Sequence, residues 1–132
     1  VEDIIEANIL ILDELEPKIE GTVEDKASIQ GRVSIGKDAY IKKGSLIRGP
    51  AIIGGNTMIA DKVYIGPYTS IGNNAKIKKG EIENSIIMDN CTIEINTKII
   101  DSIIGANSEI ITNQKGPKGH KLIVGENSKI VL

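Results

Sequence analysis

An aliphatic residue returns every six positions along the first part of this chain. The series runs without a slip through Val23, Ile29, Ile35, Ile41, Ile47, Ile53, Ile59, Ile65, Ile71 and Ile77. Four positions after each of the first nine stands a small or β-branched residue: Ala27, Val33, Ala39, Ser45, Ala51, Thr57, Val63, Thr69 and Ala75. A period of six matches neither a helix, with about 3.6 residues per turn, nor a strand, with a period of about two. It predicts a chain that coils around a triangular prism, with one short strand and one corner per six residues.

The period becomes irregular after Ile77, where inward-pointing candidates are spaced by five or six residues. These candidates are Ile82, Ile87, Ile93, Ile99, Ile104 and Ile110. A five-residue unit shortens one corner without turning the strand inside out. Since three units make one coil, the sequence predicts about three regular coils followed by two or three irregular ones. Residues 19–132 are therefore expected to form one all-β repeat domain.

Glycines recur at one place in the repeat, directly after an inward aliphatic residue. They are Gly36, Gly54, Gly66, Gly72, Gly105 and Gly125. We interpret this place as a corner, where a residue without a Cβ atom takes a positive φ. A phosphate-binding loop is the alternative, but the chain contains neither a GxxxxGK[ST] string nor a strand–GxGxxG–helix unit.

Residues 1–18 differ from the rest and predict one N-terminal α-helix over residues 2–16. Apolar residues at helical spacing form a stripe of Ile4, Ile5, Ile9, Leu12 and Leu15, with Asn8 and Asp13 off the stripe. Asp3 and Glu6 resemble a capping box, and Pro17 prevents further helix. The apolar face is expected to pack on the end of the prism or on a neighbouring domain.

The repeat breaks at residues 112–121, TNQKGPKGHK, where glycine, proline and basic residues predict an exposed loop. It resumes with Val124, Ser128 and Ile130, which we interpret as a last strand that closes the prism. Any cap over the final coil is expected here, because an open coil leaves unpaired backbone groups.

Composition and charge narrow the functional classes. The 132 residues suffice for one domain, and the absence of Phe and Trp fits a narrow core of stacked aliphatic side chains. The net charge is −2 with both signs interspersed, so we expect no nucleic-acid partner. Cys91 stands alone at an inward position, which predicts a buried thiol rather than a disulfide or a nucleophile. The chain shows neither a signal peptide nor a long apolar run, so we expect no membrane partner and a cytoplasmic location.

Few residues are candidates for chemistry. His120, the sole histidine, lies in the basic loop and is a candidate general base of an acyltransferase; a solvated loop residue is the simpler interpretation. Lys115, Lys118, Lys121 and Lys129 surround it and either attract an anion or keep a sheet edge from pairing. Carboxylates lack the spacing of metal ligands, so no metal site is expected. Tyr40, Tyr64 and Tyr68 are candidates for a flat self-association face.

The order of segments carries a family resemblance. The helix DIIEANILILDELEPKIEG, the middle IRGPAIIGGNTMIADKVYIGPYTSIG and the run EIENSIIMDNCTIE resemble the C-terminal domain of long-form glucose-1-phosphate thymidylyltransferases. The tail DSIIGANSEIITNQKGPKGHKLIVGENSKIVL resembles the end of that domain. The resemblance implies a left-handed parallel β-helix of hexapeptide repeats, preceded by one N-terminal α-helix. Handedness comes from the resemblance alone, because parallel crossovers are usually right-handed.

The resemblance also implies a function for the parent protein, which would make dTDP-glucose from dTTP and glucose 1-phosphate with Mg²⁺. That chemistry belongs to an N-terminal catalytic domain, so no catalytic residue transfers to this chain and no cofactor is expected in it. The chain begins where such a domain would end, and we expect it to be a C-terminal structural and assembly domain. Its expected partners are that nucleotidyltransferase domain and further copies of itself, as a trimer or dimer. The alternative is a hexapeptide acyltransferase domain that uses acyl-CoA, as a free-standing protein or as half of a bifunctional sugar-phosphate enzyme.

Overall fold

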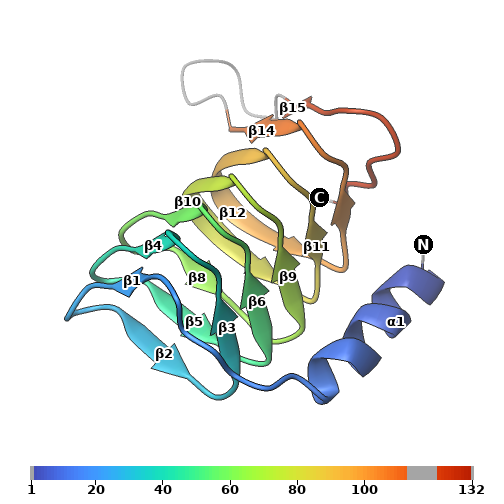
Figure 1. The fold of residues 1–132 in the computed structure, drawn as a ribbon. Coiled ribbons are helices and arrows are strands. Elements are labelled where there is room, and N and C mark those ends of the chain that lie inside the picture. Colours follow the sequence, from blue (N-terminus) through green and yellow to red (C-terminus); the bar gives the residue numbers. More distant parts are fainter. Residues whose placement is uncertain (1, 113–121, 132) are drawn as a thin grey trace.

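The structure, a computed structural model, describes residues 2–112 and 122–131. One helix, α1 (Glu2–Asp13), precedes a chain that coils upward as a parallel β-helix (Figure 1). One side of the prism is a five-stranded sheet in the order β13-β11-β9-β6-β3, with one strand from each coil. The other two sides merge into a ten-stranded sheet, because β10 and β12 continue across the corner between them. The predicted β-helix of about five coils is therefore confirmed, and it agrees with the left-handed coiling that the resemblance implies.

Most strands are only two or three residues long, as one short strand per unit requires. They are β1 (Thr22–Val23), β2 (Ser28–Gln30), β3 (Val33–Ile35), β4 (Tyr40–Ile41), β5 (Leu46–Arg48), β6 (Ala51–Ile53), β7 (Met58–Ile59), β8 (Tyr64–Ile65), β9 (Thr69–Ile71), β10 (Lys76–Glu83), β11 (Ile86–Ile87), β12 (Thr92–Ile100), β13 (Ile103–Ile104), β14 (Glu109–Ile111) and β15 (Leu122–Ile123).

The core is a set of isoleucine ladders that run along the prism. In the regular coils each residue pairs with the one eighteen positions later, as Leu46 does with Tyr64. From Ile77 onward the interval shortens to between fifteen and seventeen, as in the pairing of Ile77 with Ile93. The six isoleucines predicted to point inward after the slip are all buried, which confirms that five-residue units shorten corners without inverting strands.

Small polar side chains share the interior with the isoleucines. Ser45, Thr57 and Ser108 are almost fully buried at the inward positions where the repeat predicts small residues. Each hydroxyl donates to a corner carbonyl: Ser45 to Lys42 at 2.6 Å, Thr57 to Gly72 at 2.7 Å and Ser108 to Gly105 at 2.6 Å. These bonds satisfy backbone groups at the corners, where the sheet ladder is interrupted.

The corner glycines lie where the sequence predicts, but the physical reason given for them is wrong. Positive φ falls instead two residues later, on Asp38, Asn56, Tyr68, Asn74, Asn107 and Asn127. Glycine is required by close approach between coils, since a Cβ atom on Gly36 would lie 2.6 Å from the Gly55 amide nitrogen. Asn and Asp suit the neighbouring left-handed position because their short side chains tolerate it.

Helix α1 is shorter than predicted and lies on a side of the prism. It runs along the outer face of the five-stranded sheet rather than across the end of the β-helix, so the first of the two expected packing partners is wrong in detail (Figure 1). Asp3 lies inside the first turn instead of capping it, because the helix already begins at Glu2. Acidic residues in the first turn still favour the helix, whose N-terminus carries a partial positive charge.

The C-terminal segment reverses direction. Strand β15 pairs antiparallel with β14, and Lys129 forms an antiparallel bridge with Ile103. Residues 122–131 therefore run backward along the last coil and cover its free edge, which places the cap where the sequence predicts it. The antiparallel direction was not predicted, because a resumed hexapeptide pattern indicates a further parallel coil.

Candidate functional site

Most residues predicted to carry chemistry cannot be placed. His120, Lys115, Lys118 and Lys121 lie outside the described residues, so the acyltransferase interpretation of this loop stays a prediction. Cys91 is fully buried, and burial raises the pKa of its thiol above the usual value of 9.0. Its sulfur donates to the Gly105 carbonyl oxygen at 3.1 Å. The thiol is a core side chain, as the repeat predicted.

The most specific set of polar contacts joins α1 to the sheet that it covers. Leu12 is fully buried and Asn8 nearly so, while Ile5, Ile9 and Leu15 are half-buried. Asn8 donates from Nδ2 to the Tyr68 carbonyl oxygen at 3.2 Å and accepts from the Ser70 hydroxyl at 2.6 Å. The prediction that Asn8 lies off the packed face is therefore wrong, because a buried amide becomes acceptable once both of its ends are hydrogen-bonded.

A second cluster fixes the C-terminal end of the same helix. The Tyr68 hydroxyl donates to Asp13 Oδ1 at 2.7 Å, and this bond raises the pKa of Tyr68 above 10.0. Arg32 donates from Nη1 to the carbonyl oxygens of Asp13 and Leu15, at 2.7 and 3.4 Å. A guanidinium at this end satisfies carbonyls that lack a partner within the helix and complements its partial negative charge.

The covered sheet presents an apolar surface that sequence reasoning missed. Its outward positions alternate with the buried ladder and include Ile52, Ile86 and Ile103, each directly before an inward isoleucine. Ile103 is buried although it is on the outer face. Doubled isoleucines in AIIGG, SIIMD and SIIGA were the available signal, because several outward isoleucines on the same side of the prism indicate that something covers that side.

The three tyrosines do not form one self-association face, so that prediction is wrong. The Tyr68 hydroxyl bonds to Asp13 of the helix. The Tyr40 hydroxyl donates to Glu24 Oε2 at 2.9 Å on another side of the prism. Tyr64 lies beneath Lys98, whose ammonium is 5.8 Å from the ring centroid. The three side chains therefore make separate contacts on different parts of the domain.

Charged side chains on the sheet surfaces form local pairs. Lys98 lies 2.8 Å from Glu83 Oε2, and this hydrogen bond raises the pKa of Lys98. Glu24 also accepts from the Lys43 backbone N–H at 2.6 Å, and this bond with that of Tyr40 lowers the pKa of Glu24. Such exposed pairs stabilise a surface only modestly and do not constitute a catalytic arrangement.

Lysines gather at the corner between β7 and β8 and at the middle of β10, which crosses the same corner in the next coil. A shallow hollow of about 370 Å³ is lined there by Lys62, Lys78 and Lys79, together with Asp61 and Glu81. Lys78 and Lys79 lie one coil further along the prism than Lys62, and sequence reasoning did not group them. Because acids intersperse with the lysines, the hollow has no single sign of charge with which to hold an anion.

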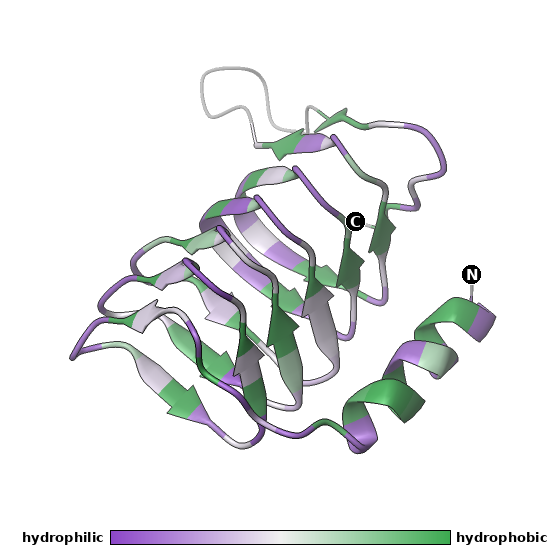
Figure 2. Cartoon of the chain, in the orientation of Figure 1, coloured by the Kyte–Doolittle hydropathy of each residue, from purple (hydrophilic) through white to green (hydrophobic). Residues whose placement is uncertain are grey.

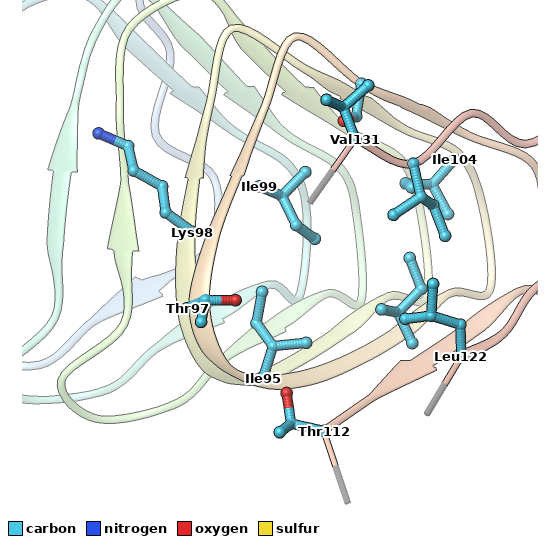
Figure 3. A pocket seen from close by; sticks show the side chains of 11 residues that line it. Ile95, Thr97, Lys98, Ile99, Ile104, Thr112, Leu122 and Val131 are labelled. Atoms are coloured by element: carbon cyan, nitrogen blue, oxygen red, sulfur yellow. The ribbon is translucent and has the colours of Figure 1, made fainter. Parts of the chain in front are cut away.

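The capped end of the prism contains a small apolar cavity. Ile95, Ile99, Ile104 and Leu122 converge on it, while Lys98 points away (Figure 3). Its volume is about 20 Å³, which is close to the space that one water molecule occupies. Ligand pockets are typically about 300–1,000 Å³, so this cavity is a packing defect beneath the cap rather than a binding site.

Clustered metal ligands and membrane-spanning helices are two further features that could define a site. Within residues 2–112 and 122–131, no three His, Cys, Asp or Glu side chains gather as metal ligands do. Among the helices in the same ranges, none has the length and apolar character needed to cross a membrane.

These features define a hexapeptide-repeat β-helix domain with a helix held to one side by specific polar contacts. The family model described as the GMPPB C-terminal domain matches residues 46–131, which is more than half of the chain. The chain belongs to this family.

Curated relatives extend the likeness to every part of the sequence. The chain is 40% identical over 132 residues to a glucose-1-phosphate thymidylyltransferase of Streptomyces antibioticus, covering 100% of this chain and 36% of the relative. It is 39% identical over 132 residues to the low-salt glycan biosynthesis nucleotidyltransferase Agl11 of Haloferax volcanii, covering 99% and 37%. The resemblance predicted from the sequence is thereby confirmed, and the chain spans little more than a third of the length of these relatives.

A third relative carries two activities in its name. A bifunctional sugar-1-phosphate nucleotidylyltransferase/acetyltransferase of Sulfurisphaera tokodaii is 38% identical over 85 residues. This match covers 64% of the chain and 21% of the relative. Nucleotidyltransferases with and without a named acetyltransferase activity therefore share this kind of domain.

Proposed function

We propose that this chain is the structural and assembly domain of a sugar-1-phosphate nucleotidyltransferase. The observation that carries the proposal is the match across the whole chain to a thymidylyltransferase of which the chain spans 36%. The parent protein would make dTDP-glucose and pyrophosphate from dTTP and glucose 1-phosphate. The reaction centre, with its Mg²⁺, would lie in the part of the parent that corresponds to the remaining length of the relatives. Because these substrates are made inside cells, we place the parent in the cytoplasm.

The described side chains support a structural role. The buried hydroxyls of Ser45, Thr57 and Ser108 bond to corner carbonyls of the prism. The contacts of Asn8, Asp13 and Arg32 hold α1 in place. A rigid body of this kind presents fixed surfaces for other parts of a protein, which is what an assembly domain requires.

The test compares the chain with its parent. The isolated chain is expected to give a β-rich circular dichroism spectrum with a cooperative thermal transition. It should form no dTDP-glucose from dTTP, glucose 1-phosphate and Mg²⁺, whereas the parent should form it. Production of dTDP-glucose by the chain alone would overturn the proposal.

Self-association is the second element of this role. In the part of the chain that the structure describes, the helix lies on one side of the prism and not on the sides formed by β1-β4-β7 and β2-β5-β8. We propose a trimer or dimer through these flat sides. Sedimentation equilibrium of the isolated chain tests this, and a monomer at every concentration would exclude it for the fragment.

An acyltransferase function is the second candidate, because one relative is named as an acetyltransferase as well as a nucleotidylyltransferase. It predicts that acetyl-CoA raises the melting temperature of the chain and that His120→Ala removes acetyl transfer. Absence of any thermal shift with acetyl-CoA, and equal activity of the His120→Ala variant, would each count against it.

A further inference from the structure

Helix α1 is apolar on both sides, although only one side is covered. Leu12 is buried against the sheet, whereas Leu10, Ile11 and Ile4 are 69%, 63% and 51% exposed. In Figure 2 much of the visible helix ribbon is apolar, with polar residues at its two ends and near its middle. A surface helix ordinarily carries polar residues on its outer face, so large apolar side chains exposed there indicate a surface that another structure covers.

The exposed residues form one surface along the helix. Ile4, Ala7 and Ile11 follow one another at spacings of three and four, and Leu10 lies three positions after Ala7. Near the N-terminal end the surface continues onto the prism, where Ile4 lines a hollow with Met88 and Ile103. Met88 is itself 44% exposed. We call the set Ile4, Ala7, Leu10, Ile11 and Met88 the outer helix surface.

This surface is held rigidly. The Asn8 amide is tied to Tyr68 and Ser70, and the C-terminal end of the helix is tied to Tyr68 and Arg32. The helix is therefore part of the body of the domain rather than a free linker. A partner that binds a pre-ordered surface avoids the entropic cost of ordering it.

Charge around the surface specifies the partner. The segment of residues 2–16 contains six acidic residues and no Lys or Arg: Glu2, Asp3, Glu6, Asp13, Glu14 and Glu16. A two-fold contact between two copies of α1 would bring these acidic rims together, which costs free energy. The complementary surface is apolar at its centre with basic residues at its rim.

We propose that the outer helix surface docks onto an apolar, basic-rimmed surface of the nucleotidyltransferase part of the parent protein. This inference rests on the proposed function. Its support is that relatives align with the chain throughout α1 and carry about two thirds of their length beyond it. The helix is thus covered by β-helix on one side and by the nucleotidyltransferase part on the other.

The experiment measures hydrogen exchange of the α1 amides in the parent and in the isolated chain. Ile11→Lys is the test variant, since lysine is a good helix former and would place a cation against the basic rim. Ile123→Lys is the matched control, because Ile123 is also an isoleucine, 52% exposed, in β15 away from α1 (Figure 1). Thermal unfolding of the isolated variants checks that both keep the fold.

In the parent, α1 amides are expected to exchange at least tenfold slower than in the isolated chain. Ile11→Lys should return them to the rate of the isolated chain, and Ile123→Lys should leave them slow. Equal exchange in parent and isolated chain would overturn the docking, as would protection that Ile11→Lys leaves intact. Protection that grows with the concentration of the isolated chain would identify a second copy as the occupant and also overturn it.

The same samples keep the two proposals apart. A parent that forms dTDP-glucose while its α1 amides stay unprotected would retain the proposed function and refute the docking. A parent inactive with dTTP and glucose 1-phosphate, yet with protection removed by Ile11→Lys, would support the docking and refute the proposed function.

Discussion

Tyr68 occupies a corner position that Asn or Asp holds in most other coils. Its φ is 61°, close to the values of 57° and 58° at Asn56 and Asn74. A bulky side chain is disfavoured in this left-handed region, so its presence needs a compensating contact. The hydroxyl bond to Asp13 and the carbonyl bond from Asn8 supply that contact. At the scale of the residue, backbone strain coincides with the docking of α1.

Replacement of Tyr68 by Asn is therefore expected to have two opposite effects. The prism should gain up to about 1 kcal/mol in free energy of unfolding, because Asn suits positive φ better. The α1 amides should exchange faster, because the bond to Asp13 is lost. Urea unfolding and hydrogen exchange measure the two effects, with Tyr68→Phe as the control that loses the bond and keeps the strain. Loss of prism stability in Tyr68→Asn with unchanged α1 exchange would contradict this account.

The pH dependence of Glu24 follows from its bonds to Tyr40 and the Lys43 amide. These bonds lower the folded pKa below 4.5, so the stabilisation is complete above that value and is lost as the pH falls through the lowered pKa. The stability difference between the wild type and Glu24→Gln should shrink as the pH is reduced through this range. Urea unfolding at several acidic pH values checks this, and a difference that widens on acidification would contradict it.

At the scale of the element, α1 combines one buried and one open apolar side. The buried side forms because Leu12 and the half-buried Ile5 and Ile9 meet a sheet face that carries outward isoleucines. The helix stays docked although its other side is exposed. Asn8 bonds to the prism near the middle of the helix, and Asp13 bonds to Tyr68 and Arg32 at its C-terminal end. The element therefore behaves as part of the prism and not as a linker.

Leu12→Ala and Leu10→Ala provide a matched pair on the same helix. Leu12→Ala should cost about 2–4 kcal/mol of α1 docking, since Leu12 is fully buried, whereas Leu10→Ala should change stability by less than about 0.5 kcal/mol. Hydrogen exchange of α1 amides together with urea unfolding separates local undocking from global unfolding. Equal losses from both variants in the isolated chain would show that the outer side is already covered there.

The sequence predicted the prism well because its signal is repeated. Each inward isoleucine reinforces the same register, and even the slips after Ile77 preserve the inward set. Features that occur once were missed, because nothing in the repeat specifies them. The sequence places Asn8 off the apolar stripe, and its burial is explained only by the Ser70 hydroxyl and the Tyr68 carbonyl beside it. The reversed direction of residues 122–131 was likewise hidden, because Val124, Ser128 and Ile130 fit a parallel coil equally well.

At the scale of the whole molecule, the two ends of the prism differ. Residues 122–131 run along the last coil, whereas β1 and β2 each pair with a strand on one side only, namely β4 and β5. Val23 and Ile29 remain partly exposed at this first coil. In a solenoid, stability is a sum of coil and nearest-neighbour terms, so the coil with one neighbour is the weakest.

Hydrogen exchange along the isolated chain should show this gradient. Amides of residues 22–30 are expected to exchange at least tenfold faster than those of residues 63–71, which have coils on both sides. The exchange rates of peptides of comparable length from the two regions can be compared within one mass-spectrometric experiment. Equal protection would mean that the first coil is covered in solution, and sedimentation would then identify association through that end.

The reversal at residues 122–131 determines how such a protein can change length in evolution. A parallel coil added after the last one would have to displace a segment that pairs in the opposite direction, so the C-terminal end is closed to growth. Between β4 and β9 each residue pairs with the one eighteen positions later, so a duplication of eighteen residues there inserts one complete coil and preserves every inward position. Relatives with longer or shorter prisms are therefore expected to differ by whole coils from the middle, with the helix-covered side and the reversed end retained.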